Sequence, residues 1–190
     1  MRSTDLIRKT KETHVSVKLN LDGKGVFDID TPITFMNHML STFSKHSHID
    51  LTINARGDSP HHIVEDIAIT LAEAINQALG DKIGIERFGE ANIPMDDTLA
   101  QVILDISGRP YYVLSIDFKR PTIDDIATED IIHFLKTFAS SLKINIHAKV
   151  LYGENDHHKI EALFKALAVS LKRAIKNTGG TTSPSTKGVI

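Results

Sequence analysis

The chain has 190 residues, of which 41% are hydrophobic and 24% charged, with a formal net charge of −2. This composition is typical of a soluble globular protein and gives no reason to expect binding to nucleic acid. The absence of cysteine excludes disulfides and thiolate metal ligands, and no apolar run approaches the roughly 18 residues of a membrane helix, so we expect a cytoplasmic protein without a membrane partner.

The first half of the chain predicts, in order, a β-hairpin, a helix, a strand and a helix. Apolar residues alternate over 15–21 and continue at 26–29, with turn glycines between the two runs, which predicts the hairpin. Helical spacing over 33–43 predicts the first helix, and alternation over 49–53 predicts the next strand. Residues 57–60 break that strand, and apolar residues then recur at helical period over 63–79 until Gly80.

The second half repeats this order. Residues 99–106 and 111–118 read as strands around a turn at 107–110, and residues 131–141 as a helix. A strand over 142–151 and a long helix over 157–176 follow. We therefore predict a single α+β domain made of two pseudo-repeats, about 1–92 and 93–178, followed by a mobile C-terminal tail at 179–190.

Both halves contain the same set of histidines and a glutamate. His38 precedes the His61-His62-x-x-Glu65 motif by 23 residues, and His133 precedes the second motif by 24 residues. The second motif is His157-His158-x-x-Glu161. A repeat at a fixed offset indicates an internal duplication, and here the duplicated residues are all of types that bind metals.

Each His-His-x-x-Glu motif stands where a helix is predicted to begin. Asp58 and Asp156 lie just before the two predicted helices and are candidates to cap them. Residues four apart on a helix face the same side, whereas adjacent residues diverge by about 100°. Each pair of adjacent histidines should therefore be divided between two metal ions. Six histidines and two glutamates suffice for two sites of four nitrogen and oxygen ligands, which suits Mn²⁺ or Fe²⁺ better than Zn²⁺.

Several motifs in chain order resemble the imidazoleglycerol-phosphate dehydratase family. The matching segments are residues 8–13 (RKTKET), 35–40 (FMNHML), 61–66 (HHIVED), 87–89 (RFG), 94–97 (PMDD), 105–110 (DISGRP), 155–162 (NDHHKIEA) and 184–188 (PSTKG). The resemblance implies a fold of two ribosomal S5 domain 2-like βα halves, with the helices packed between two mixed sheets. It also implies a hydro-lyase of histidine biosynthesis, which converts D-erythro-imidazoleglycerol phosphate to imidazoleacetol phosphate and water.

The resemblance further implies two Mn²⁺ sites that bind the imidazole or imidazolate of the substrate. One site would use His38, His62, His157 and Glu161; the other would use His61, Glu65, His133 and His158. The partners expected from the family are a small-molecule phosphate substrate and other copies of the chain, in a symmetric shell of about 24 subunits that share their sites.

Residue-by-residue matching also assigns the substrate contacts. Arg87, Arg109, Ser185 and Lys187 match the phosphate-binding positions of the family, and Glu12 matches a carboxylate that contacts the substrate. Arginine and lysine are good phosphate partners, and Glu12 is the candidate for catalytic proton transfer.

Three departures from the family pattern are a short loop at 57–60, Ser41-Thr42 in place of Asp-Gln, and Asp97 in place of Glu; none is expected to touch a metal ligand. Two other functions compete with the dehydratase. A dinuclear phosphate-ester hydrolase usually uses more carboxylate ligands than this chain offers, and a metal-storage protein would not need the phosphate-binding set.

Overall fold

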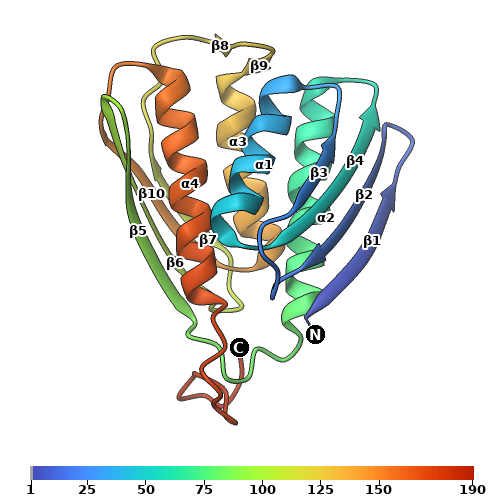
Figure 1. The fold of residues 1–190 in the computed structure, drawn as a ribbon, viewed down its shortest axis with the longest axis vertical. Coiled ribbons are helices and arrows are strands. Elements are labelled where there is room, and N and C mark those ends of the chain that lie inside the picture. The colour runs from blue at the N-terminus through green and yellow to red at the C-terminus, as the bar shows by residue number, and fades with distance from the viewer. Residues whose placement is uncertain (1) are drawn as a thin grey trace.

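Two four-stranded sheets enclose the helices in the computed structural model of this chain, which describes residues 2–190 (Figure 1). The first sheet has the order β1-β2-β4-β3, and the second has the order β5-β6-β10-β7. The last strand of each sheet is parallel to its neighbour and the other pairs are antiparallel. The predicted α+β architecture, with mixed sheets on both sides of the helices, is confirmed.

The strand bounds follow the repeat. The first sheet comprises β1 (Ser3–Lys9), β2 (Thr13–Asn20), β3 (Phe27–Asp30) and β4 (Asp50–Gly57). The second comprises β5 (Phe88–Met95), β6 (Thr98–Asp105), β7 (Tyr111–Ser115) and β10 (Asn145–Tyr152), with a small hairpin of β8 (Thr122–Ile123) and β9 (Ile126–Ala127). The first set of elements ends at Leu79 and the second begins at Phe88, so residues 80–87 link the two halves.

The predicted hairpin pairings were wrong in both halves. The hairpins are β1–β2 and β5–β6, whereas β3 and β7 each pair in parallel with the strand that follows a helix. The strands β1 and β5 were not predicted, because β1 lies at a sheet edge with no buried residue and β5 has only two. Apolar alternation, the main signal for a strand, is weak in such segments.

The four helices that the structure describes are α1 (Thr34–Ser47), α2 (Pro60–Leu79), α3 (Thr128–Leu142) and α4 (Asp156–Ala174). The helices of each half cover the sheet of that half. Between the two sheets, however, α1 packs on α4 and α2 packs on α3. Aromatic side chains join the halves in this layer: Phe43 meets Phe138 edge to face, with ring centroids 6.3 Å apart. The core is therefore shared, and helices from different halves form the two close pairs.

The predicted caps were also wrong by one position at each motif. Ser59 and Asn155 cap α2 and α4 by accepting the backbone N–H of His62 and His157, respectively. Asp156 is instead the first residue of α4 and is buried, where it accepts from the Lys159 ammonium at 2.8 Å and from two backbone N–H groups at 119 and 120. The start of α1 is capped from the other half, because the Asp125 carboxylate accepts the backbone N–H groups of Thr34 and Phe35.

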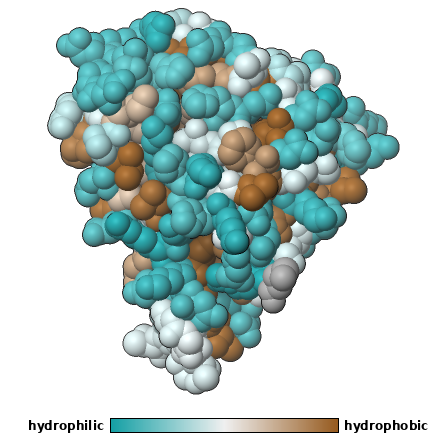
Figure 2. Space-filling view, in the orientation of Figure 1, coloured by the Kyte–Doolittle hydropathy of each residue, from teal (hydrophilic) through white to brown (hydrophobic). Residues whose placement is uncertain are grey.

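None of the described helices is long and apolar enough to cross a membrane. The face drawn in Figure 2 is largely hydrophilic, with apolar groups in separate small patches.

Candidate metal and substrate site

The helix pairing brings ligands from both halves together. His38 on α1 lies beside His157 and Glu161 on α4, and one ligand atom from each lies within 4.8 Å of the others. The Glu161 Oε2 atom is 3.6 Å from the Nε2 atoms of both histidines. We call these three residues the first triad.

A second triad consists of His61 and Glu65 on α2 with His133 on α3. The Nε2 atom of His133 is 3.1 Å from Glu65 Oε1, and the imidazole rings of His61 and His133 lie 4.8 Å apart. The two triads are equivalent under the internal repeat, since each takes one histidine from one half and a His-x-x-x-Glu pair from the other. The structure thus gathers the ligand atoms of three members of the first predicted set into one cluster, and it places His133 of the second set next to both Glu65 and His61.

Within one chain, His62 does not join the cluster of His38, His157 and Glu161, and the described residues show no contact between His158 and the second triad. The His62 ring is 6.1 Å from the His61 ring, and its Nδ1 atom is 2.8 Å from Asp58. His158 diverges from His157 in the same way, and its Nδ1 atom is 2.5 Å from Asp97. The rings of each histidine pair diverge, as helical spacing predicts, and one chain brings together only three of the four candidate ligands of each predicted set.

Carboxylates lie beside the Nδ1 atoms of all four histidines in the two pairs, and three of them are hydrogen-bonded there. Besides Asp58 and Asp97, these are Asp130, which is 2.6 Å from His61, and Asp124, which is 3.4 Å from His157. An acceptor at Nδ1 fixes the ring and the tautomer and leaves Nε2 free for a metal ion. The Asp58 hydrogen bond also raises the pKa of His62.

Sequence analysis missed these supporting carboxylates. Asp58 could have been found, because it stands four residues before His62 beside the first turn of the same helix, whereas Asp130 reaches His61 only because α3 packs on α2. Asp124 reaches His157 through the fold alone. Asp97 corrects a specific expectation: this departure from the family pattern does contact a predicted ligand, and the hydrogen bond with His158, together with two backbone N–H groups, holds the pKa of Asp97 well below its usual range.

The glutamate of the first triad carries its charge in a crowded position. Burial opposes ionisation of Glu161, but hydrogen bonding to Lys165, whose ammonium lies 2.8 Å away, keeps the pKa of this carboxyl below its usual value. A carboxylate and neutral imidazoles are the forms that bind divalent ions. The donors fit a metal such as Mn²⁺, which accepts mixed nitrogen and oxygen ligands.

The predicted phosphate-binding residues lie together, but far from the triads. The Arg87 backbone N–H donates to the carbonyl of Ala174, the last residue of α4, and its side chain binds Asp105 and the Pro184 carbonyl. The C-terminal Ile190 lies against Gly108, next to Arg109, so the tail with Ser185 and Lys187 is at this end as well. The first triad lies at the start of α4, and 19 helical residues span about 28 Å. Figure 1 shows the tail at the end of the molecule opposite to the start of α4.

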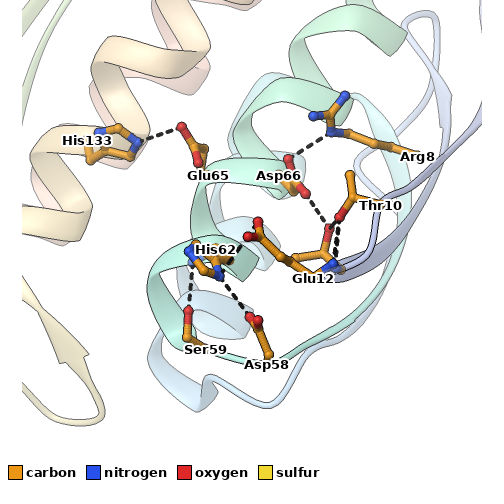
Figure 3. A network of polar contacts seen from close by, with 10 residues as sticks. Arg8, Thr10, Glu12, Asp58, Ser59, His62, Glu65, Asp66 and His133 are labelled. Atoms are coloured by element: carbon orange, nitrogen blue, oxygen red, sulfur yellow. Dashed lines mark hydrogen bonds and ion pairs between the residues drawn. The ribbon is translucent and has the colours of Figure 1, made fainter.

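Glu12 lies at the other end, close to the metal-ligand candidates. It precedes β2, and its carboxylate is 3.8 Å from His62 Nδ1 (Figure 3). The fold and this geometry define an α+β repeat protein with two groups of imidazole and carboxylate side chains, built where paired helices meet.

Comparisons with known proteins identify the family. The family model of imidazoleglycerol-phosphate dehydratase matches residues 31–171. Relatives with this name include those of Methanosarcina mazei, 51% identical, and Chloroherpeton thalassium, 50% identical; the alignments cover 100% of this chain and 100% and 98% of the relatives.

Solved structures agree with the sequence relatives. The Pyrococcus furiosus enzyme, in complex with (S)-C348, superposes with a TM-score of 0.86 at 37% identity, over 97% of this chain and 100% of that one. The Staphylococcus aureus imidazoleglycerol-phosphate dehydratase gives 0.85 at 34% identity, over 93% of this chain and 99% of that one. The chain therefore belongs to the imidazoleglycerol-phosphate dehydratase family and is a hydro-lyase of histidine biosynthesis, which sets aside the hydrolase and storage alternatives.

Proposed function

We propose that this chain catalyses the Mn²⁺-dependent dehydration of D-erythro-imidazoleglycerol phosphate to imidazoleacetol phosphate. The two triads, each completed by one further histidine, would hold two metal ions per subunit. A bound divalent ion would act as a Lewis acid toward the imidazole of the substrate. The observation that carries the proposal is the pair of equivalent triads in a chain of this family.

We infer that the fourth ligand of each site comes from a neighbouring copy of the chain. His62 would complete the first triad of one neighbour, and His158 would complete the second triad of another or of the same neighbour. Support comes from their surroundings, since a carboxylate lies at the Nδ1 atom of each ring and His62 does not join the cluster of His38, His157 and Glu161 in its own chain. Exchange of ligands between identical copies favours a closed, symmetric assembly, for which the family resemblance suggests about 24 subunits.

The phosphate group of the substrate would also require a second chain. A small phosphate ester is much shorter than the roughly 28 Å of α4 that separates the triads from Arg87 and the tail. We therefore propose that Arg87, Arg109, Ser185 and Lys187 bind the phosphate of a substrate whose imidazole lies at the triads of a neighbour. Arg87 keeps its charge throughout, because hydrogen bonding to Asp105 raises the pKa of its guanidinium.

Glu12 is the proposed proton-transfer group. The reaction removes a hydrogen from a carbon that no carbonyl activates and expels a hydroxyl, so a positioned base is needed near the imidazole. The Glu12 carboxylate lies beside His62 from the turn before β2, and its distance of 3.8 Å from His62 Nδ1 is too long for a hydrogen bond. The carboxylate is therefore free to accept a proton from the substrate.

The test is a direct assay of imidazoleacetol phosphate formation, with the chain loaded with Mn²⁺ and again after chelation. Product should form only with metal, and the Glu12→Gln variant should lose turnover while retaining the wild-type metal content. The matched control is Glu73→Gln, which changes an exposed glutamate on α2 and should leave turnover unchanged. Absence of product from the fully metal-loaded chain would refute the proposed function.

A further inference from the structure

We propose that Asp66 and Thr13 are positioning residues that fix Glu12 for proton transfer. This inference rests on the role proposed above for Glu12. Asp66 is on α2, directly after Glu65 of the second triad, and is only 6% exposed. A buried carboxylate needs hydrogen-bond donors, and those of Asp66 come from the two strands that flank the turn containing Glu12.

The donors reach Asp66 from both sides of that turn. The Arg8 Nε atom of β1 donates to Asp66 Oδ1 at 2.8 Å, and the Thr13 hydroxyl of β2 donates to Asp66 Oδ2 (Figure 3). Glu12 is thus the residue immediately before one anchor. Both anchors attach the turn to the helix that carries His61, His62 and Glu65. They therefore fix the position of Glu12 relative to the candidate metal ligands.

The hydrogen-bond network extends from Asp66 through Thr13 and Thr10 to the backbone of Glu12. An ionised carboxylate only accepts, so the Thr13 hydroxyl must donate to Asp66 and can accept from the Thr10 hydroxyl, 3.2 Å away. The Thr10 oxygen in turn accepts the backbone N–H groups of Glu12, at 3.1 Å, and of Thr13, at 2.9 Å. Every donor and acceptor in this chain of bonds is matched, which fixes the backbone of Glu12.

The second half of the chain provides an internal comparison. Asp97 precedes β6 as Glu12 precedes β2, and Thr98 is the counterpart of Thr13 at the start of the strand. The helix position equivalent to Asp66, four residues after the second histidine of the pair, is Ala162. Accordingly the Thr98 hydroxyl is buried without a hydrogen-bond partner among the described residues.

The two equivalent carboxylates are therefore used differently. Asp97 is held by its own side chain, which accepts the backbone N–H groups of Glu154 and Asn155 and contacts His158. Among residues 2–190 the Glu12 carboxylate accepts no hydrogen bond, and the structure holds the backbone of Glu12 instead. A carboxylate that must stay free for a substrate can be positioned only through neighbours, and the Asp66 network is present only in the half where that is required.

The experiment compares Thr13→Val, Thr13→Ser and Thr98→Val in the metal-loaded, assembled protein. Thr13→Val keeps the branched shape but removes the hydroxyl, and a displacement of about 1 Å at a catalytic group can lower turnover on the order of 100-fold. We expect kcat to fall by that order with KM and metal content unchanged. Thr13→Ser restores the hydroxyl and should recover most of kcat, and Thr98→Val should match the wild type.

Two further variants, Arg8→Gln and Glu12→Gln, distinguish failure of this inference from failure of the proposed role of Glu12. Arg8→Gln changes a partly exposed anchor and should lower kcat without preventing folding, even if Thr13→Val proves unstable. Glu12→Gln is measured in parallel: if it keeps wild-type turnover, the proposed role of Glu12 fails and the inference falls with it. If Glu12→Gln is inactive while Thr13→Val and Arg8→Gln turn over like Thr98→Val, the inference alone is overturned.

Discussion

Complementation between two inactive variants tests whether the sites are shared between chains. His38→Ala destroys the first triad, and His62→Ala removes the proposed fourth ligand while leaving the first triad of its own chain intact. Each variant alone should lack turnover, because every first site then misses one ligand. A co-expressed mixture, however, contains sites in which an intact triad meets an intact His62 from the other variant.

The expected recovery follows from counting. With equal amounts and random assembly, half of the triads are intact and half of the neighbours supply His62, so about one site in four should regain all its ligands. Turnover and Mn²⁺ bound at the first site should therefore both reach about a quarter of the wild-type value. The readouts are product formation and the metal content of the purified mixed assembly.

The matched control mixes His38→Ala with His157→Ala. Both residues belong to the same triad of one chain, so every chain in this mixture has a broken triad and no turnover should return. If the first mixture also stays inactive, the four ligands do not come from two chains as we infer. Recovery in the control mixture would equally contradict the triad assignment.

Three further outcomes are expected. Chelation should dissociate the assembly and lower its unfolding temperature, because ligands from two chains link metal binding to association; light scattering after gel filtration would detect this, and an intact assembly without metal would contradict it. Asp156→Asn should cost about 3–5 kcal/mol of unfolding free energy, since it leaves the buried Lys159 ammonium without its ion-pair partner. Burial opposes ionisation of Asp156, but Lys159 holds the pKa of this carboxyl below 3.8. The difference in unfolding free energy between the wild type and Asp156→Asn, measured by urea titration, should therefore be full above that pH and decrease at lower pH. Asp125→Ala should cost about 1 kcal/mol in denaturant unfolding, because α1 loses the cap on Thr34 and Phe35, and an unchanged midpoint would refute the cap.

The helices could be predicted closely from sequence, whereas the pairing of strands could not. Apolar residues at helical period reach from Ile63 to Leu79, and α2 ends at that residue. The strand β1 gives no comparable signal, because it contains no buried residue. Which strands pair depends on the path that the chain takes between them. Strand β4 follows α1 in the chain and joins the sheet between β2 and β3, so β2 and β3 do not pair with each other.

The candidate site was predictable to the extent that its geometry is local. The divergence of His61 from His62 follows from helical spacing alone, and the ring positions agree with it. The grouping of His38 with His157 and Glu161 depends on α1 packing on α4, which no local pattern encodes. Supporting carboxylates such as Asp124 are set by the same long-range packing.

The pairing of helices across the halves also bears on how such a chain could arise. Each triad takes one histidine from one repeat and two ligands from the other, so a single repeat could form a triad only by associating with a second copy of itself. The present chain is equivalent to such a dimer joined through residues 80–87. Covalent linkage replaces a concentration-dependent encounter with an intramolecular one. It also allows the two copies to diverge in sequence. Glu12 and Asp97 stand at equivalent positions, and Asp97 supports His158 whereas Glu12 is the proposed proton-transfer group.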